Sequence, residues 1–262
     1  MPGKRSHLLG DERRREIVRL LKNDGRVSIE DLVERFQVSA VTLRGDLGRM
    51  AKQGLLVRSY GGAMLPQGTQ QEYPLEIKRA IYHAEKVRIG QAAAALVSPL
   101  QTLILDSGTT SAEVARAIKS SGCAPLTVIT HALTIADEFA DTPTISVIML
   151  GGLLRHVAGS FVGPQAQRFL SELHANHCFI GVDGLDAEAG LSTPDLLEAQ
   201  LNTLMMKVSD EVTVVADASK FGRRSLSVIG PITAARRIIT DDRASLEALD
   251  AIRGKGVEVV VV

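Results

Sequence analysis

The apolar residues of the first sixty positions recur at helical spacing in three short segments. The first segment runs from Asp11 to Asn23, the second begins at Ser28 and the third begins at Ser39. Both serines are natural helix caps, because a serine hydroxyl accepts a hydrogen bond from a free backbone N–H of the first turn. The inward-facing side chains are expected to be Ile17, Leu20, Leu21, Ile29, Leu32, Val33, Phe36, Leu43, Leu47 and Met50.

A short apolar run over Leu55–Val57 follows the third helix and predicts a strand. Tyr60, Gly61 and Gly62 then turn the chain back, so the strand and its return form a wing. Three helices and a wing predict a winged helix-turn-helix domain over residues 1–65.

The composition changes after the wing. The segment from Ala63 to Tyr73 is rich in Pro, Gly, Gln and Thr, which predicts a hinge over residues 66–76. Pro74 can occupy the first position of the next helix, which is expected to continue without interruption to about Val97.

From residue 77 onward, short apolar runs alternate with segments of helical length. The runs are rich in β-branched residues and continuously apolar, as in strands that helices cover on both faces. This pattern predicts an α/β fold with a parallel sheet over residues 77–262. The expected strands are Thr102–Leu105, Leu126–Ile129, Ile145–Leu150, Cys178–Ile180, Val212–Ala216, Ile238–Ile239 and Val257–Val261.

The formal net charge is zero, but the charge is unevenly distributed. Residues 1–60 contain 13 Lys and Arg against 8 Asp and Glu, whereas the remainder contains 17 against 22. In the third helix, a face of threonine and cations points away from the apolar stripe, and its residues are Thr42, Arg44, Arg49 and Lys52. A small helix with such a face suits the major groove, so the first domain is expected to bind double-stranded DNA.

Polar residues and glycine directly follow the predicted strands of the second domain. Ligands of open α/β sheets bind beyond the carboxyl ends of the strands, so these residues predict a pocket at one rim of the sheet. They are Asp106, Thr130, Gly151, Asp183, Asp217 and Asp241.

Asp106, Ser107, Gly108, Thr109 and Thr110 lie between a predicted strand and a predicted helix over residues 111–119. Gly108 allows a tight turn, and the hydroxyls and free N–H groups at the positive helix end are expected to face outward. This arrangement favours a phosphate site. The alternative is an ordinary strand–turn–helix with threonine caps.

Three further positions belong to the same predicted rim. Asp183 lies between two glycines, and the alternative interpretation is a simple turn. Lys220 can reach an anion or an acid in the pocket, although loop lysines are more commonly solvated. Glu198 and Asn202 are four residues apart on one helix face, where such pairs commonly hydrogen bond at the surface.

Metal and disulfide chemistry have little support. His174, His177 and Cys178 are close in sequence, but His177 and Cys178 are neighbours in a predicted strand and point to opposite faces. The two cysteines, Cys123 and Cys178, form no disulfide framework, which indicates a reducing compartment. We expect no metal, no signal peptide and no membrane span, and hence a cytoplasmic protein.

These motifs together resemble the DeoR family of bacterial transcriptional regulators over essentially the whole chain. The resemblance in the first domain runs from Arg14 through VSAVTLRGDL to RSYGGA. In the second domain it comprises DSGTT, the pair Gly151-Gly152, GVDG, Gly190 to Thr193, and DASKFG. The resemblance implies a sensor domain like the sugar-phosphate isomerase and deaminase fold. It also implies a repressor, not an enzyme, whose operator affinity changes with a phosphorylated sugar.

The chain departs from the family's usual residues at several positions. Gly45 stands where a second arginine is common, and Gly48 follows on the same helix. Asn202 stands where many members have lysine, and His131 where asparagine is common. LSTPDLLEAQLN and the C-terminal SLEALDAIRGKGVEVVVV are most similar to the amino-sugar branch, the N-acetylgalactosamine regulators. A hexosamine phosphate is therefore the expected effector, and no other cofactor is expected.

The expected assembly is a dimer or tetramer on repeated operator half-sites. The residues expected at the DNA are Ser28, Ser39, Ala40, Thr42, Leu43, Arg44, Arg49, Arg58 and Tyr60. The residues expected at the effector are Asp106, Ser107, Gly108, Thr109, Thr110, Gly152, Asp183, Glu198, Asn202 and Lys220. Two alternatives remain: a sugar-phosphate isomerase or deaminase with an accessory DNA-binding head, and a protein-interaction adaptor whose winged helix binds no DNA.

Overall fold

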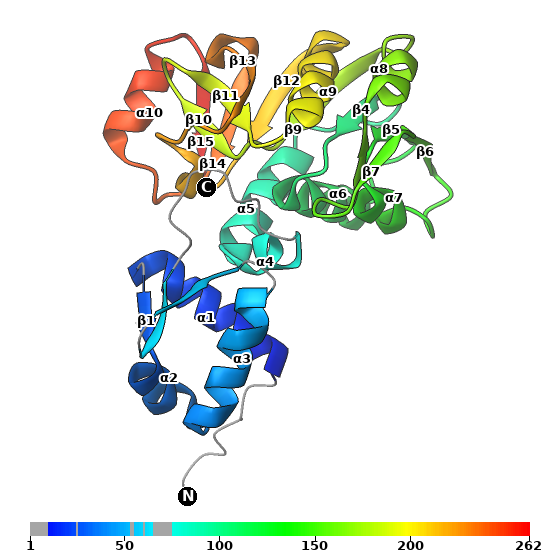
Figure 1. Ribbon diagram of the computed structural model, residues 1–262. Helices are drawn as coiled ribbons and strands as arrows, with labels where there is room; N and C mark the ends of the chain where they lie inside the picture. The colour runs from blue at the N-terminus through cyan, green and yellow to red at the C-terminus, as the bar shows by residue number, and fades with distance from the viewer. Residues whose placement is uncertain (1–9, 25, 53–54, 60, 65–74) are drawn as a thin grey trace, which may run out of the picture. The chain divides into compact units, whose positions relative to one another are not determined.

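The computed structural model describes residues 10–24, 26–52, 55–59, 61–64 and 75–262 (Figure 1). The chain divides into two compact units, Met1–Ile81 and Tyr82–Val262. Most of the expected hinge, 66–76, lies outside the described residues. The division falls a few residues after the expected domain start at residue 77, because helix α4 (Leu75–Ala80) packs against the first helix of the first unit. No described helix has both the length and the apolar character needed to cross a bilayer.

The first unit contains the three expected helices and a three-stranded antiparallel sheet in the order β1-β3-β2. Ser28 and Ser39 cap helices as expected, since their hydroxyls accept hydrogen bonds from the backbone N–H groups of Asp31 and Thr42 at 3.0 and 3.1 Å. The elements are α1 (Gly10–Asp24), β1 (Arg26–Ser28), α2 (Ile29–Phe36), α3 (Ala40–Lys52), β2 (Val57–Ser59) and β3 (Gly62–Met64).

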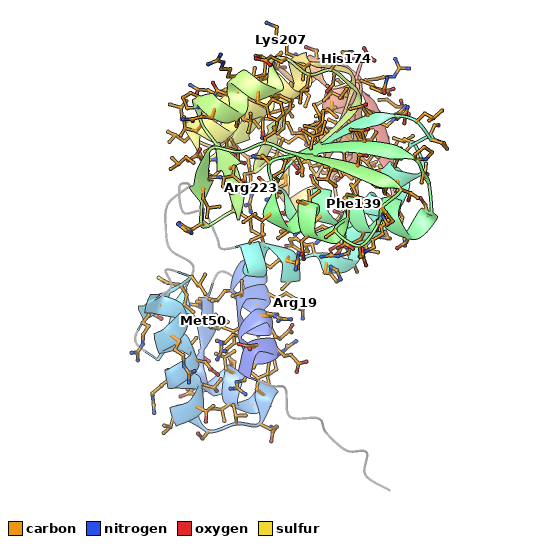
Figure 2. All side chains as sticks on the ribbon, turned by 90° about the vertical axis from the view of Figure 1, so that its right-hand side faces the viewer. Arg19, Met50, Phe139, His174, Lys207 and Arg223 are labelled. Carbon is orange, nitrogen blue, oxygen red and sulfur yellow. The ribbon has the colours of Figure 1, made fainter. Side chains whose placement is uncertain are left out.

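The wing differs from the prediction at its start and in its strand count. The strand predicted over residues 55–57 begins only at Val57, because Leu55 and Leu56 are buried in the core at 3% and 2% exposure. Strand β1, between α1 and α2, was not predicted because its three residues show no apolar pattern. The stripe of α3 is confirmed, since Leu43, Leu47 and Met50 are at most 1% exposed (Figure 2 labels Met50).

The uninterrupted helix expected from Pro74 to Val97 is wrong. The described part consists of two helices, α4 and α5 (His83–Ala94), separated at Ile81 and Tyr82. Tyr82 adopts the left-handed conformation with φ of 53°, which ends a right-handed helix. The guanidinium of Arg243 lies 3.8 Å from the centre of the Tyr82 ring, a cation–π contact that stabilises this break.

The second unit is built on a parallel sheet of seven strands in the order β15-β14-β12-β9-β4-β5-β6. All seven predicted strands are present in it, with ends shifted by up to three residues. Their bounds are β4 (Thr102–Leu105), β5 (Leu126–Thr130), β6 (Ile145–Met149), β9 (Ala175–Ile180), β12 (Ser209–Val215), β14 (Arg237–Thr240) and β15 (Glu258–Val261).

The order of these strands reverses between β4 and β9. From β4 the chain adds β5 and β6 on one side, and from β9 it adds β12, β14 and β15 on the other. The two neighbouring connections therefore leave the sheet in opposite directions, which opens a crevice beyond the carboxyl ends of β4 and β9.

Two apolar cores cover the two faces of the sheet. Alternate strand residues enter different cores: Cys178 packs in one and Phe179 in the other, as a two-residue period requires. Helices α5, α6 (Thr109–Ser121) and α7 (Leu133–Glu138) cover one face; α8 (Pro164–Leu170), α9 (Leu196–Lys207) and α10 (Leu246–Arg253) cover the other (Figure 1).

Two small antiparallel sheets in this unit were not predicted. Their strands have three or four residues and mixed composition, so they are too short to show a period. One sheet pairs β7 (Leu153–Arg155) with β8 (Ser160–Val162), and the other orders β10 (Gly184–Asp186), β11 (Gly190–Thr193) and β13 (Ser227–Gly230). Two short 3-10 helices, η1 (Ala218–Lys220) and η2 (Ile232–Ala234), complete the unit.

Substitution of Gly90 by alanine is expected to destabilise the second unit. A Cβ at Gly90 would lie 2.7 Å from the backbone carbon and oxygen of Glu113, where α5 and α6 pack closely. The cost is expected to be about 1–3 kcal/mol of unfolding free energy, from forced separation of the two helices. Gly45→Ala is the matched control, because nothing lies within 4 Å of its Cβ position and alanine favours a helix by about 1 kcal/mol. Calorimetric unfolding of the full chain should show opposite shifts, and a lower transition temperature for both would contradict this packing.

Acid is expected to destabilise the second unit through His177. Burial lowers the pKa of His177 to about 4, and its Nε2 lies 2.8 Å from Thr213 Oγ1. The unfolded chain therefore takes up a proton below its ordinary pKa of about 6.5 while the folded chain does not, so stability is lost as the pH falls from 6.5 towards 4. At pH 5 the loss is about 2 kcal/mol.

His177→Gln keeps a group that can reach Thr213 but does not titrate. Comparison of urea unfolding at pH 7 and pH 5 should show a smaller loss for this variant than for the unsubstituted chain. Some loss should remain, because burial also lowers the pKa of His131 to about 4. Equal losses in both proteins would exclude His177 as a source of the acid sensitivity.

Candidate functional site

The exposed face of α3 carries the groups expected to meet DNA. Thr42, Arg44 and Arg49 are exposed on this helix, and Arg58 is exposed on β2 of the wing. Val41 is 76% exposed on the same helix. Sequence patterning missed Val41, because an apolar residue near an apolar stripe was not recognised as outward-facing. An exposed apolar side chain at the start of such a helix can contact a thymine methyl group.

The cations of the first unit fall into two sets. Arg14 pairs with Asp46 at 2.9 Å, and Arg19 and Arg35 pair with Glu16 at 2.7 and 3.0 Å (Figure 2 labels Arg19). By contrast, Arg44, Arg49 and Arg58 form no ion pair with any residue in the described part of the chain. Unpaired positive charge is therefore present on α3 and the wing, where a phosphate backbone can neutralise it, although Arg15 on α1 and Arg26 on β1 also form no ion pair among the described residues.

A buried ion-pair group holds α3 against α1. Asp46 on α3 is 2% exposed, and its carboxylate pairs with Arg13 at 2.7 Å and with Arg14 at 2.9 Å. No local sequence pattern indicates this contact, because Arg13 and Arg14 precede Asp46 by more than thirty residues. The contact fixes the position of α3 from its inner side and leaves its outer face free.

Other residues expected at the DNA have structural roles. Ser28 and Ser39 cap helices, and the hydroxyls of Ser39 and Thr42 are 2.9 Å apart. Leu43 is fully buried, so its side chain packs in the core and is not placed to contact DNA. Ala40 is half-buried at the start of α3, and Tyr60 lies outside the described residues.

The crevice between β4 and β9 is held together by Asp106. This carboxylate is 2% exposed and accepts hydrogen bonds from the backbone N–H groups of Gly108 at 3.1 Å and Gly181 at 2.9 Å. The Ser111 hydroxyl donates a further hydrogen bond to it. Burial raises the pKa of Asp106, while these three donors act in the opposite direction. Because both of its oxygens are engaged, Asp106 braces the two loops instead of presenting a free carboxylate to a ligand.

The phosphate-site candidate opens directly from this brace. Gly108 is the N-cap of the thirteen-residue helix α6 and has an extended backbone. The side chains of Ser107, Thr109 and Thr110 retain only 6–8% exposure, so the expectation that their hydroxyls face outward is wrong. They are buried where the loop after β4 leads into α6.

Asp183 and Lys220 meet at the same crevice. The ammonium of Lys220, on η1 after β12, lies 3.1 Å from Asp183 Oδ1, after β9. Both side chains are about one fifth exposed, so an incoming anion can reach the lysine. The sequence prediction that these two residues share one rim is consistent with the pairing of β9 and β12.

Gly152 has a backbone role. Its φ of +133° disfavours any side chain, and a Cβ there would lie 2.5 Å from the carbonyl oxygen of Val162. The residue thus permits the close approach of β7 and β8.

A second polar cluster adjoins the crevice and contains Arg155, a residue that sequence patterning missed. Arg155 is the last residue of β7, and its side chain is 9% exposed. Its Nε lies 3.2 Å from Asp195 Oδ2. Its Nη1 also bonds to Oε2 of Glu198, whose other oxygen accepts from the Thr193 hydroxyl at 3.0 Å. The cluster joins the crevice through the backbone, since the Asp183 N–H donates to the Ser192 carbonyl at 3.0 Å.

Several polar atoms beside this cluster are buried without a hydrogen-bond partner. They are His131 Nε2, Ser160 Oγ, and both amide atoms of Asn202. Asn202 follows Glu198 by one turn of α9 and is 1% exposed, so it does not form the surface pair with Glu198 that its spacing suggested. Burial lowers the pKa of His131 to about 4, and the charge of Arg155 acts in the same direction.

The three residues considered as metal ligands each contact a different part of the second unit. His174 is exposed and lies 2.9 Å from Asp210, His177 contacts Thr213, and Cys178 is in the apolar core. Among the described residues, no group of three or more His, Cys, Asp and Glu could hold a metal ion.

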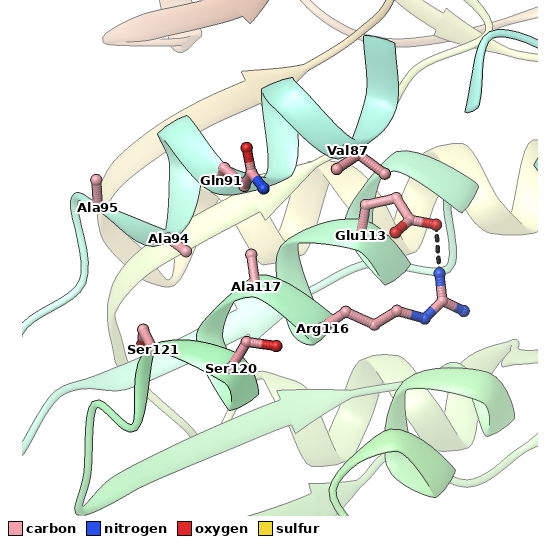
Figure 3. Close-up of a pocket in the computed structure, with 9 residues that line it drawn as sticks. All are labelled: Val87, Gln91, Ala94, Ala95, Glu113, Arg116, Ala117, Ser120 and Ser121. Carbon is pink, nitrogen blue, oxygen red and sulfur yellow. Dashed lines mark hydrogen bonds and ion pairs between the residues drawn. The ribbon is translucent and has the colours of Figure 1, made fainter. Parts of the chain in front are cut away.

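A hollow of about 420 Å³ lies elsewhere on the second unit, between α5 and α6 (Figure 3). Its lining includes alanines of both helices, two serines of α6 and one ion pair, between Glu113 and Arg116. No residue of the crevice or of the cluster around Arg155 contributes to it. It therefore lies apart from the residues with binding chemistry.

Comparison with known proteins assigns both units to one family. The profile of the DeoR C terminal sensor domain matches residues 81–242, and that of the DeoR-like helix-turn-helix domain matches residues 13–69.

Relatives match over nearly the full length. The chain is 38% identical over 253 residues to a protein of Escherichia coli O157:H7 provisionally named the aga operon transcriptional repressor, covering 96% of this chain and 93% of the relative. It is 33% identical to the glycerol-3-phosphate regulon repressor of Escherichia coli K12, covering 88% and 90%. Ribose 5-phosphate isomerase A of Neisseria gonorrhoeae is similar at a TM-score of 0.38 and 15% identity, over 53% of each chain, which gives no information on the ligand. The chain belongs to the DeoR family of transcriptional regulators.

Proposed function

We propose that this chain represses a catabolic operon for a sugar, of the amino-sugar class, and that a phosphorylated sugar controls its binding to the operator. The observation that carries the proposal is the crevice at the reversal of strand order, into which the N-terminus of α6 and Lys220 both open. The relatives named as repressors of the aga operon and of the glycerol-3-phosphate regulon support the same class of regulation.

The operator is bound by the first unit. Helix α3 enters the major groove with Val41, Thr42 and Arg44 near the base edges, while Arg49 and Arg58 contact phosphates. Two such units in a dimer or tetramer would place two recognition helices on repeated half-sites.

The effector is bound by the second unit. Its phosphate lies at the N-terminus of α6, where the first N–H groups of the helix have no partner within the helix, and Lys220 supplies a positive charge. The loop of Ser107, Thr109 and Thr110 provides hydroxyl groups inside the crevice. The sugar extends towards Asp183 and the cluster around Arg155.

A chain of contacts links the effector crevice to the start of α5. Asp241, after β14, accepts a hydrogen bond at 2.7 Å from the backbone N–H of Ala218, on the same 3-10 helix as Lys220. Asp241 also pairs with Arg243, whose guanidinium stacks on Tyr82 at the N-cap of α5. Because Tyr82 directly follows the last residue of the first unit, movement of Lys220 on a ligand can change the backbone at the junction. A coupling of about 1–3 kcal/mol changes DNA affinity 5- to 150-fold.

A regulator is favoured over an isomerase or deaminase by the protonation chemistry of the crevice. Asn202 has no acid–base function, and both oxygens of Glu198 are held by Arg155 and Thr193. Both oxygens of Asp106 are likewise engaged. Absence of turnover of hexosamine 6-phosphates by the full chain would agree with a regulator, whereas measurable turnover would support the enzyme.

Arg44→Ala is expected to weaken operator binding by about 1–3 kcal/mol, or roughly 5- to 150-fold, because it removes an unpaired cation from the groove-facing surface of α3. Gel-shift titration of the DNA upstream of the gene, at several salt concentrations, provides the measurement. Arg19→Ala is the control: Arg19 is exposed on α1 but paired with Glu16. Equal affinities for the Arg44 variant and the unsubstituted chain would show that α3 is not the recognition helix.

Thr109→Val and Lys220→Met are expected to weaken effector binding at least ten-fold while operator binding without effector stays unchanged. The first removes a hydroxyl from the α6 N-terminus without changing its shape, and the second removes the crevice cation. The measurement is release of operator DNA by a panel of hexose and hexosamine 6-phosphates. Lys207→Met, an exposed position at the end of α9, is the control. If both crevice variants respond like the control, the phosphate site is elsewhere.

A further inference from the structure

The unpartnered polar atoms near Arg155 lie on elements that touch one another. Ser160 forms an isolated bridge with Ala132, the residue after His131, and pairs in register with Arg155. Helix α9, which carries Asn202, packs against β8. His131, Ser160 and Asn202 are each at most 1% exposed. Four unsatisfied atoms in one neighbourhood are unusual, since buried polar groups normally have partners and each unmade hydrogen bond costs free energy.

The position of the proton on the His131 ring follows from its hydrogen bond to Phe161. Nδ1 lies 2.8 Å from the carbonyl oxygen of Phe161, which can only accept, so Nδ1 carries the proton. The ring is neutral near pH 7, because burial and Arg155 lower the pKa of His131 to about 4. Nε2 is therefore a bare lone pair that can accept from a hydroxyl or an N–H of a ligand.

Asn202 and Ser160 complete a set of donors and acceptors. The Asn202 amide offers an accepting oxygen and a donating nitrogen side by side, and Ser160 can donate or accept. Two adjacent ligand hydroxyls, or a hydroxyl next to an N–H, match this amide, because one group donates to Oδ1 and the other accepts from Nδ2. The match requires hydrogen-bonding groups on the ligand that carry no negative charge.

The charge of the neighbouring groups excludes a carboxylate at this position. Arg155 is the one cation of the cluster, and it is already paired with the two acids Asp195 and Glu198. A ligand carboxylate would also face the lone pair of His131. Sugar acids are therefore disfavoured, and polyols, hexoses and hexosamines are favoured.

We propose that His131 and Asn202 select the effector by hydrogen bonding to adjacent hydroxyl or hydroxyl and nitrogen groups of a neutral or amino sugar. This inference rests on the proposed function, because it takes the sugar phosphate from that proposal and assigns the groups that read its ring. Thr109 and Lys220 hold the phosphate; His131 and Asn202 distinguish one sugar from another.

The test compares Asn202→Leu and His131→Asn with the unsubstituted full chain. Leucine has nearly the shape of asparagine without its polar atoms, and the asparagine amide nitrogen can replace Nδ1 at Phe161 but offers nothing at Nε2. Calorimetric titration uses glucose, glucosamine, galactosamine and N-acetylgalactosamine 6-phosphates, the 2-, 3- and 4-deoxyhexose 6-phosphates, and 6-phosphogluconate. Each variant is expected to bind the preferred sugar phosphate about ten-fold more weakly. The ratio of its affinity for that sugar to its affinity for one deoxy analogue should fall towards one. 6-Phosphogluconate should bind weakly to the unsubstituted chain and to both variants.

Stability separates this selection from a merely structural role. Without ligand, Asn202→Leu is expected to raise the unfolding temperature, because it removes an unsatisfied amide from the interior. Thr240→Val is the matched control: Thr240 Oγ1 is also buried without a partner, but on β14. The Thr240→Val variant should also unfold at a higher temperature, and its affinity for every sugar phosphate of the panel should equal that of the unsubstituted chain.

Two negative results have different meanings. If the two variants keep the affinities and the sugar preference of the unsubstituted chain, the atoms are satisfied by enclosed water alone and the inference is overturned. If Thr109→Val and Lys220→Met still weaken binding in that case, the proposed function stands. If no sugar phosphate of the panel binds the unsubstituted chain, the proposed function fails, and the selection of a sugar by His131 and Asn202 fails with it.

Discussion

The carboxylate of Asp106 is the constraint on which the crevice between β4 and β9 depends. The connections that follow β4 and β9 leave the sheet in opposite directions, so their loops are separated. Without a bond between these loops, the width of the crevice would vary. Asp106 supplies this bond, because one oxygen holds its own loop at Gly108 and the other holds the neighbouring loop at Gly181. Its burial makes the unbonded carboxylate costly, so the loops are stable only when both bonds are made. The position of the α6 N-terminus follows from that requirement.

Each unit uses a buried carboxylate in this way. In the first unit, Asp46 pairs with Arg13 and Arg14 and so fixes α3 against α1. In the second, Asp241 binds the backbone N–H of Ala218 and the side chain of Arg243, which stacks on Tyr82. Loss of a partner from such a group is strongly destabilising, whereas small movements of the pair are transmitted to both elements. Asp241 thereby connects the loop of Lys220 with Tyr82, the first residue of the second unit, and in the proposed function it passes on the response to a ligand.

Sequence patterning predicted the large features and missed those made by contacts distant in sequence. Continuous apolar runs identified all seven parallel strands, because strands that are covered on both faces are predominantly apolar. The reversal at β4 and β9 depends on strand order, which no local pattern encodes. Tyr82 breaks a segment that reads as one helix, since its left-handed backbone is stabilised by Arg243, more than 150 residues away. The short strands of β7 and β8 carry Arg155 and Ser160, so missing these strands meant missing part of the site.

The polar groups of the crevice divide by whether their hydrogen bonds are already made. Asp106 and Glu198 are saturated by protein donors, so a ligand gains little from them and their effect is to fix the shape of the site. His131 and Asn202 are enclosed and unsatisfied, so a ligand that supplies their partners removes an existing cost as well as forming new bonds. An analogue that lacks a matching group restores that cost, which is why sites of this kind discriminate strongly between closely related ligands. In the proposed function, the saturated groups therefore fix the frame of the site, while the few unsatisfied side chains set the sugar to which this regulator responds.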